Sequence, residues 1–325
     1  MSFIIQTPGL LTSIQDRGRF KHQRFGVPVS GPMDAAAFKA ANQLVGNPDT
    51  CAGLEFLLQG PSFTVYQDCL IALTGRGFSL QVDHQPMPPW TSILVRFGQE
   101  VQITKTNSGN WGYLGVSGGF QVEKLMGSYA TYLRGKIGGM DGKPLSQGDE
   151  LQIGTQPGSF LEIAGCCIAE RFQPAYQDEV ILDVIIGPQE DYFTDEGSHT
   201  FYSESFQISH TSDRMGFRLD GPVIEHRTGA DIISEGMIFG SIQVPASGQP
   251  IIMMAEHPTT GGYCKIATVA SYVLPLLAQS PIGSGKIRFN AISVQEAQKK
   301  KKQIDCMQNQ WLKDPIDLEF SDTRF

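Results

Sequence analysis

The chain has 325 residues, a length that suits two domains of middling size better than one. Apolar residues make up 41% of it, enough to fill a core in each domain, and charged residues make up only 18%. The 36 glycines and 19 prolines favour many turns and short strands over a helical bundle. The formal net charge of −8 argues against a nucleic-acid partner, because phosphate binding needs a basic face.

The sequence gives no sign of a membrane span or of export. No apolar run reaches the roughly 18 residues that a membrane-spanning helix needs, and residues 1–6 lack the basic and apolar regions of a secretory signal. The six cysteines are scattered and, like the six histidines, have no metal-ligand spacing. We interpret the cysteines as thiols in a reducing cytosol and expect a cytoplasmic protein without a metal site.

Short apolar runs punctuated by Gly and Pro dominate the chain and predict β-strands. In chain order they lie at residues 63–66, 69–73, 92–97, 100–103, 150–153, 180–186, 241–244 and 250–254. Their spacing is typical of a barrel or a sandwich. A polar stretch at 171–178 precedes a new strand and marks the expected boundary between two domains.

Helical pattern is scarce. Residues 34–44 predict a helix, because Asp34 can cap it and the segment is rich in Ala. A second long helix is expected at 294–312, where we interpret the lysines 299–302 as a solvated face rather than a nuclear or RNA-binding signal.

Two shorter helical segments are also expected. A turn or short helix should follow residues 191–193. Another short helix is expected at 268–277, interrupted by Pro275.

The segment 280–286 (SPIGSGK) resembles a phosphate loop but departs from it at two positions. Ser280 and Ile287 stand where that motif has Gly and a hydroxyl residue, so we expect a hairpin turn before a strand. A glycine-rich dinucleotide fingerprint between a strand and a helix is missing as well.

A first polar, glycine-rich segment spans residues 12–34. It ends at a predicted helix N-terminus, which is an intrinsic anion site, and Arg17 or Arg19 could bind a carboxylate or phosphate through its planar fork. The alternative is a long connection with structural arginines and Asp34 as a helix cap.

A second such segment spans residues 212–265. Arg214 can bind an oxyanion, Gln243 can donate and accept hydrogen bonds, and Thr260 can add a hydroxyl to a nest of backbone N–H groups. Tight turns would explain about half of its glycines, but they do not explain the polar side chains gathered beside them.

Taken in order, these motifs resemble the carboxyltransferase-domain B family. That family includes the C subunit of ATP-dependent 5-oxoprolinase, also described as an antikinase antagonist and as allophanate hydrolase subunit 2. The resemblance covers roughly residues 3–290, through the segments 9–19, 26–28, 31–34, 54–55, 113–119, 134–139, 145–149, 187–189, 212–221, 234–250 and 259–263. It implies a mainly β fold of two tandem cyclophilin-like β-barrels with few helices. We expect the first barrel in residues 1–172, the second in 173–292, and a helical tail in 293–325.

The resemblance also implies a function. The chain would be one component of a multi-subunit 5-oxoprolinase that opens the lactam of 5-oxo-L-proline to L-glutamate with ATP hydrolysis. It would act only with a B-type carboxyltransferase-domain subunit and an A-type 5-oxoprolinase subunit. ATP, for which this chain has no motif, would be held jointly with a partner or entirely by it.

Two alternatives stay open. The first is a component of a biotin-dependent, urea-carboxylase-type carboxyltransferase. Its biotin would arrive on another chain, because no Met-Lys-Met attachment site is present. The second is a regulatory protein that sequesters its B-type partner and thereby releases a histidine kinase.

Lactam opening needs cations on developing oxyanions and a carboxylate that positions or deprotonates water. We assign catalytic roles to Arg214, Glu235 and Asp213, with Asp213 orienting Arg214. The expected substrate- or nucleotide-binding residues are Arg17, Asp34, Gln243, Ser247, Thr260, Gly261, Tyr263 and Lys265. At residues 256–258 (Glu-His-Pro) the family usually has an Asp-Arg-Gln-like run, so one cation of the expected site is missing.

Overall fold

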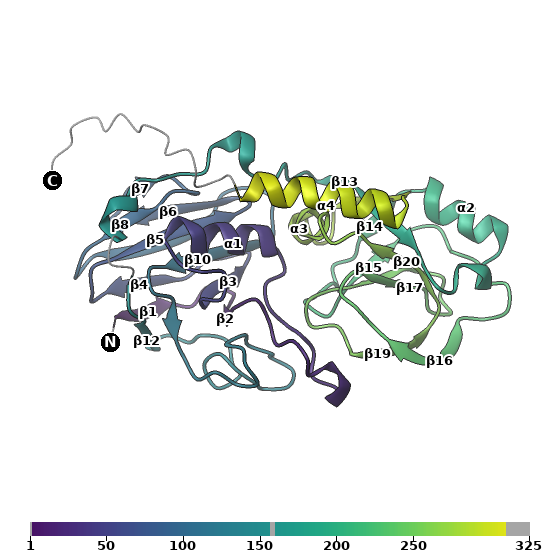
Figure 1. Ribbon diagram of the computed structural model, residues 1–325, viewed down its shortest axis with the longest axis horizontal. Helices are drawn as coiled ribbons and strands as arrows, with labels where there is room; N and C mark the ends of the chain where they lie inside the picture. The colour runs from purple at the N-terminus through teal and green to yellow at the C-terminus, as the bar shows by residue number, and fades with distance from the viewer. Residues whose placement is uncertain (1, 157–159, 310–325) are drawn as a thin grey trace.

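The computed structural model describes residues 2–156 and 160–309. It is mainly β, as predicted, and its two halves lie side by side along the long axis (Figure 1). Every predicted strand coincides with an observed one to within about two residues at either end. The apolar runs alone were sufficient to locate them, because each run buries at least one face.

The N-terminal half contains two antiparallel sheets around one apolar core. The seven-stranded sheet has the order β11 (Phe120–Gln121), β12 (Glu150–Ile153), β1 (Phe3–Thr7), β4 (Ser62–Val65), β9 (Glu100–Lys105), β6 (Phe78–Val82) and β7 (Gln85–Met87). The five-stranded sheet has the order β2 (Leu11–Gln15), β3 (Gly53–Leu57), β10 (Trp111–Val116), β5 (Cys69–Gly75) and β8 (Ile93–Val95).

Strand β5 explains why one of the predicted runs is apolar throughout. Ile71 and Leu73 point into the core between the two sheets, whereas Leu70 and Ala72 lie in a second apolar cluster with helix α1 (Ala35–Leu44). Both faces of the strand are therefore covered, and a continuous apolar run replaces the usual alternation.

The C-terminal half is a closed seven-stranded barrel. Its order is β13 (Glu179–Ile186), β20 (Lys265–Val269), β17 (Ser241–Gln243), β18 (Ile251–Met253), β15 (Gly216–Asp220), β14 (Phe206–Ile208) and β21 (Lys286–Ala291). Strands β13 and β21 close it by parallel pairing. A two-stranded ribbon, β16 (Asp231–Gly236) and β19 (Thr260–Tyr263), lies at its lower end in Figure 1. The prediction of a barrel is confirmed for this half, whereas the other half contains two separate sheets and no closed barrel among its described residues.

Three helices begin at side-chain caps, of which the sequence indicated the one at Asp34. The Asp34 side chain caps α1 (Ala35–Leu44) by accepting a hydrogen bond from Ala37 N at 2.9 Å. The expected segment after residue 193 is α2 (Asp195–Ser203), capped by Thr194. Helix α4 (Val294–Gln308) begins at a capping box formed by Ser293 and Glu296. Residues 310–312 of the predicted helix lie outside the described part of the chain.

One helix prediction was wrong in its start. Residues 265–269 form strand β20, and helix α3 (Leu274–Gln279) begins only after it. The β-branched Thr268 and Val269 favour the strand. Pro275 lies in the first turn of α3, where its missing N–H costs nothing, so it starts the helix instead of interrupting it.

Within residues 2–156 and 160–309, no helix is both long and apolar enough to cross a membrane. All six cysteines fall in this part of the chain, and none forms a disulfide. The same residues contain no cluster of His, Cys, Asp and Glu suited to a metal ion.

Candidate functional site

The predicted site residues separate into two clusters. One lies at the joint between the two halves and includes Arg214 and Asp34. The other lies where the β16–β19 ribbon meets the barrel and includes Glu235 and Lys265. We call them the joint cluster and the ribbon cluster.

Arg214 is the centre of the joint cluster. Its guanidinium lies between two carboxylates: Nε donates to Glu256 Oε1 at 2.7 Å, and Nη1 donates to Glu55 Oε1. Nη2 donates to the Gly31 carbonyl at 2.8 Å. Arg214 and Glu256 come from the barrel half, whereas Glu55 and Gly31 come from the N-terminal half. The side chain of Arg214 is only 6% exposed, so this ion triad joins the halves out of reach of solvent.

Further hydrogen bonds extend the joint cluster through Glu55. Glu55 Oε2 accepts from Met33 N at 2.7 Å and from the Tyr113 hydroxyl at 2.8 Å. Tyr113 in turn accepts from Asp34 N at 2.8 Å. Residues 31–34 therefore make the structural contacts that the alternative interpretation of that segment expected.

Asp34 is fully buried and bonds to both halves. Beyond capping α1, its carboxylate accepts from the Tyr176 hydroxyl at 2.6 Å and from Gln279 Nε2 at 3.1 Å. Burial raises the pKa of Asp34, although these donors and the Ala37 N–H oppose the rise. Burial alone would lower the pKa of Arg214, but the carboxylates of Glu55 and Glu256 raise it, so the guanidinium stays charged.

Asp213 does not orient Arg214, contrary to expectation. Its carboxylate accepts from Met215 N and Gly216 N at 2.8 and 3.2 Å, and it forms an exposed ion pair with Arg134 at 2.9 Å. A tight turn at Asp213 directs the two adjacent side chains to different partners. Glu256 takes the orienting role, so the Glu-His-Pro run contributes an acceptor for Arg214 to the joint cluster.

The ribbon cluster is built around Lys265. Its Nζ donates to Glu235 Oε2 at 2.7 Å, and Gln189 Nε2 donates to the same oxygen at 3.1 Å. Gln189 Oε1 also accepts from Lys265 N at 3.2 Å, so one amide fixes both members of the ion pair. The Lys265 side chain is 6% exposed and that of Glu235 is 49% exposed. A nearly buried cation thus meets a carboxylate that solvent can reach.

The electrostatics of this pair keep the carboxylate charged. Hydrogen bonds from Lys265 and Gln189 lower the pKa of Glu235. Both bonds use Oε2, which leaves Oε1 without a partner among the described residues. That oxygen can accept a hydrogen bond from water or substrate, while the ammonium can stabilise negative charge beside it.

The other predicted residues of this region are only partly brought together. Gln243 Nε2 donates to the Tyr263 carbonyl at 3.3 Å. A Cβ on Gly261 would lie 2.3 Å from Gln243 Nε2, so a side chain there would displace the Gln243 amide. Thr260 is exposed on β19, close in sequence to this group. Ser247 lies in an exposed turn and accepts from Gln249 N at 3.4 Å, apart from the cluster.

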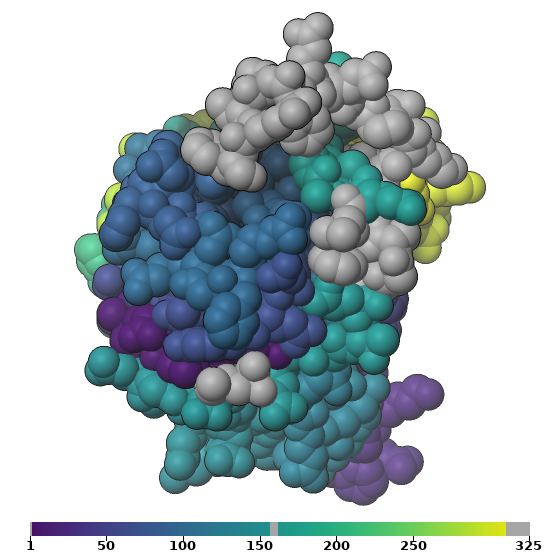
Figure 2. Space-filling view, turned by 90° about the vertical axis from the view of Figure 1, so that its left-hand side faces the viewer, coloured from purple at the N-terminus to yellow at the C-terminus, as the bar shows by residue number. Residues whose placement is uncertain are grey.

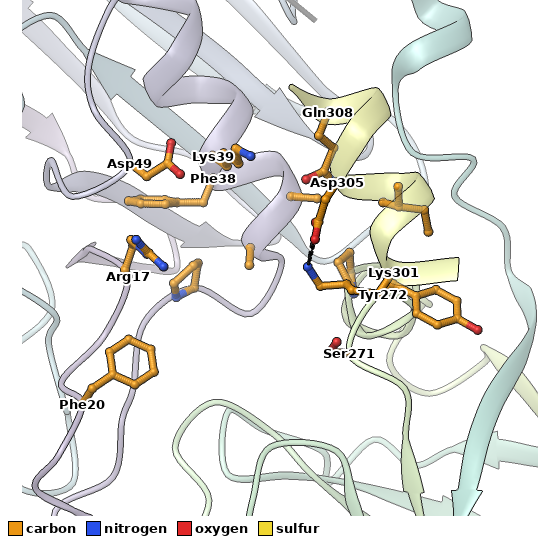
Figure 3. A pocket seen from close by; sticks show the side chains of 15 residues that line it. Arg17, Phe20, Phe38, Lys39, Asp49, Ser271, Tyr272, Lys301, Asp305 and Gln308 are labelled. Carbon is orange, nitrogen blue, oxygen red and sulfur yellow. Dashed lines mark hydrogen bonds and ion pairs between the residues drawn. The ribbon is translucent and has the colours of Figure 1, made fainter. Parts of the chain in front are cut away.

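Arg17 lines a cavity of about 350 Å³ between the two halves (Figure 3). Lys39 from α1 and the Lys301–Asp305 ion pair of α4 line the same cavity. The first turn of α1 contributes Ala35 and Ala36, so Arg17 does lie near that helix start. Arg19 instead is buried and donates to backbone carbonyls, which makes it a structural arginine.

The segment 280–286 forms a turn before strand β21, as expected, but it follows helix α3 and is therefore not a hairpin turn. Gly283 has φ +89°, and a Cβ at this residue would lie 2.0 Å from the His210 ring. The glycine at this turn therefore allows the close approach of the His210 ring.

Four residues of these clusters were missed by sequence reasoning: Gln189, Glu55, Tyr113 and Glu256. The segments 54–55, 113–119 and 187–189 stood among the matching motifs, which was the available signal. The predicted site residues that they bind are 42 to 159 positions away, and only the folded chain shows these pairings.

Comparisons with known proteins give a matching family and similar subunits. The family described as carboxyltransferase domain, subdomain A and B, matches residues 25–291. The C subunit of the Haemophilus influenzae 5-oxoprolinase is 37% identical over 290 residues, covering 88% of this chain and 90% of that protein. The C subunit of the Escherichia coli 5-oxoprolinase is 33% identical over 293 residues, covering 90% and 91%.

A solved structure is similar over nearly the whole chain as well. The K. lactis urea amidolyase has a TM-score of 0.89 and 27% sequence identity. The match covers 95% of this chain but only 20% of that one. The family match spans the joint cluster, the ribbon cluster and both halves of the fold. The chain therefore belongs to the carboxyltransferase domain family, subdomain A and B.

Proposed function

We propose that this chain is the C subunit of an ATP-dependent 5-oxoprolinase, which opens the lactam of 5-oxo-L-proline to L-glutamate. One observation carries the proposal: the C subunits of two bacterial 5-oxoprolinases align with it over about nine-tenths of both lengths. In this proposal the chain is active only together with a B-type and an A-type subunit.

The ribbon cluster supplies the chemistry in this proposal. Glu235 Oε1 positions or deprotonates the attacking water, and the Lys265 ammonium stabilises the developing oxyanion. Gln243 and Tyr263 border the substrate, with Thr260 and Gly261 providing a hydroxyl and close backbone access. Catalytic roles for Arg214 and Asp213, and binding roles for Arg17, Asp34 and Ser247, stay predictions.

ATP is bound mainly by partner subunits in this proposal. Its support is that the phosphate-loop-like segment of this chain departs from the motif at Ser280 and Ile287. The nucleotide activates the lactam when bound, and the residues of this chain orient water and hold charge. The free cysteines favour a cytoplasmic, reducing compartment.

The fold proposal keeps the predicted domains. In this proposal residues 1–172 and 173–292 are two cyclophilin-like barrel domains, followed by the predicted tail 293–325, of which residues 310–325 lie outside the described part of the chain. In support, the two N-terminal sheets enclose a single apolar core, as an opened barrel would.

A second candidate is a component of a biotin-dependent carboxyltransferase. The TM-score of 0.89 to a urea amidolyase favours it. The two functions make different demands: carboxyl transfer requires biotin on another chain, whereas lactam opening requires only ATP and the partner subunits.

The test is glutamate production from 5-oxoproline by the three purified subunits. We expect ATP-dependent glutamate only when all three are present, and no activity from this chain alone. Parallel reactions omit each subunit in turn or supply carboxylated biotin with urea. Turnover by the single chain, or carboxyl transfer without lactam opening, would contradict the proposal.

A further inference from the structure

Two loops of the N-terminal half form a surface that the proposed chemistry does not use. They are residues 17–26 and 122–143, here called the basic loop pair. In Figure 2 they lie along the lower edge, the first in purple and the second in blue-green. They contain eight of the chain's 25 Lys and Arg residues but only two of its 33 Asp and Glu residues. An otherwise acidic chain thus concentrates positive charge in one place.

Buried bonds hold the two loops together. Arg19 is fully buried and donates from Nε to the Leu125 carbonyl at 3.1 Å and from Nη2 to the Ala130 carbonyl at 2.7 Å. Asp16, immediately before the first loop, accepts from Ser128 Oγ at 2.6 Å and from Tyr129 N at 2.8 Å. Because these bonds already exist in the unbound chain, the loops lose less conformational entropy when a partner binds than unordered loops would lose.

The outer side of the basic loop pair is both apolar and cationic. Four large apolar side chains are exposed on it: Phe20, Phe25, Leu125 and Met126. Arg24 stacks on Phe25 with its guanidinium carbon 4.6 Å from the ring centroid. Exposed apolar groups gathered with arginine and aromatic residues are typical of protein interfaces.

We propose that the basic loop pair docks an acidic surface of a partner subunit, whose apolar groups cover Phe20 and Phe25. This inference rests on the proposed function, because one component of a multi-subunit enzyme must bind the others. Charge complementarity selects the partner: seven cations of the loop pair are exposed, and acidic groups opposite them would steer association.

The experiment measures binding of this chain to the purified A-type and B-type subunits at low and high salt. The variants are Arg24→Glu with Lys136→Glu, and separately Phe25→Ser. We expect at least tenfold weaker binding for each, and a smaller salt dependence for the charge variant. Arg134 is left unchanged because it pairs with Asp213 across the two halves.

Matched controls lie elsewhere on the surface. Phe97→Ser removes a side chain that is 68% exposed, against 66% for Phe25. Lys299→Glu with Lys302→Glu reverses two exposed charges on α4. We expect near-normal binding for both controls, and circular dichroism melting establishes that all variants fold.

The outcomes separate the inference from the proposed function. A wild-type chain that binds neither partner argues against the function itself. Normal assembly of the loop variants overturns only the docking surface. A raised KM for ATP with unchanged assembly, or a salt-sensitive dimer of this chain alone, would assign the loops to a nucleotide or a second copy and would also overturn it.

Discussion

Arg214 is held by Glu55 and Glu256 where water cannot reach it. Replacing it with Met would leave two buried carboxylates without their cation. We expect Arg214→Met to lower the free energy of unfolding by about 3–5 kcal/mol. Denaturant unfolding monitored by circular dichroism measures the loss.

The control for this variant is Arg227→Met, whose partner Asp195 is fully exposed. An exposed pair contributes about 0–1 kcal/mol, so this change should be nearly neutral. Equal stability of the two variants would contradict a structural role for Arg214. If Arg214→Lys kept its melting temperature and lost about tenfold in activity in the assembled enzyme, the catalytic assignment would gain support.

Lys265 and Glu235 make a prediction about activity and pH. Lys265→Gln should reduce kcat by about 10²- to 10³-fold, because a preorganised charge beside the reacting group is lost. The pKa of Glu235 is lowered, so its side chain becomes protonated and loses its charge only as pH falls through that lowered value. Activity should therefore decline on the acid side. Glu235→Gln should lose most of the rate, and the rate that remains should not decline in acid.

Steady-state rates of the assembled enzyme across pH provide the measurement. Asp231→Asn, also exposed on β16, is the matched control and should keep the wild-type profile. An unchanged acid limb in Glu235→Gln would place the titrating group elsewhere.

Residues close in sequence were easier to predict than their partners. Gln243, Tyr263 and Lys265 stand in one polar segment, so their proximity could be read from the chain. Gln189 could not be placed, because strand pairing within the barrel brings it to Glu235 from 46 positions away. Glu55 likewise could not be predicted as the partner of Arg214, because that contact joins the two halves of the fold.

At the scale of an element, helix α4 depends on few contacts. Among its described residues only Ala297 is buried, and Lys300 Nζ donates to Asp183 Oδ2 at 2.7 Å. Asp183 also accepts from Tyr272 and Asn290. Partial burial raises the pKa of Asp183, but these hydrogen bonds outweigh it and hold the pKa below its usual value. The carboxylate therefore pins α4 to the barrel at neutral pH.

We expect Lys300→Ala to speed hydrogen exchange of the α4 amides several-fold without altering the barrel. The exposed neighbour Lys299→Ala should leave their exchange unchanged, apart from propensity effects. Hydrogen exchange measured by mass spectrometry follows the α4 amides and the barrel strands separately. Equal protection in both variants would mean that apolar packing alone retains the helix.

The start of α4 was predictable, whereas its attachment was not. Ser293 and Glu296 form a local capping box that can be recognised from spacing alone. The lysine run was expected to be solvated, and Lys299 and Lys302 are. Lys300 departs from this pattern because Asp183, on a distant strand, lies within its reach.

At the scale of the whole molecule, the two halves share one buried boundary. Gln279 Nε2 donates to the Trp111 carbonyl at 2.8 Å, and Asn110 Nδ2 donates to the Ala278 carbonyl at 2.8 Å. A single apolar cluster continues from α1 to the barrel. We expect one cooperative unfolding transition in calorimetry, and Gln279→Ala should lower its midpoint without splitting it.

The control is Gln249→Ala, at an exposed turn within the barrel half, which should leave the midpoint nearly unchanged. Two separate wild-type transitions would contradict the shared boundary. The chain length and the polar stretch at 171–178 indicated two halves, but the depth of their contact depends on side chains that meet only after both have folded.

Because β13 and β21 run parallel, the chain enters the barrel at one end and leaves it at the other. Helix α4 then returns over its 15 residues, a rise of about 22 Å. Asn309 Oδ1 consequently lies 3.3 Å from Lys39 Nζ, on the same half of the molecule as β1 (Figure 1). Both ends of the described chain thus emerge beside the N-terminal sheets. A longer polypeptide can therefore carry the whole unit as an insertion attached at one side.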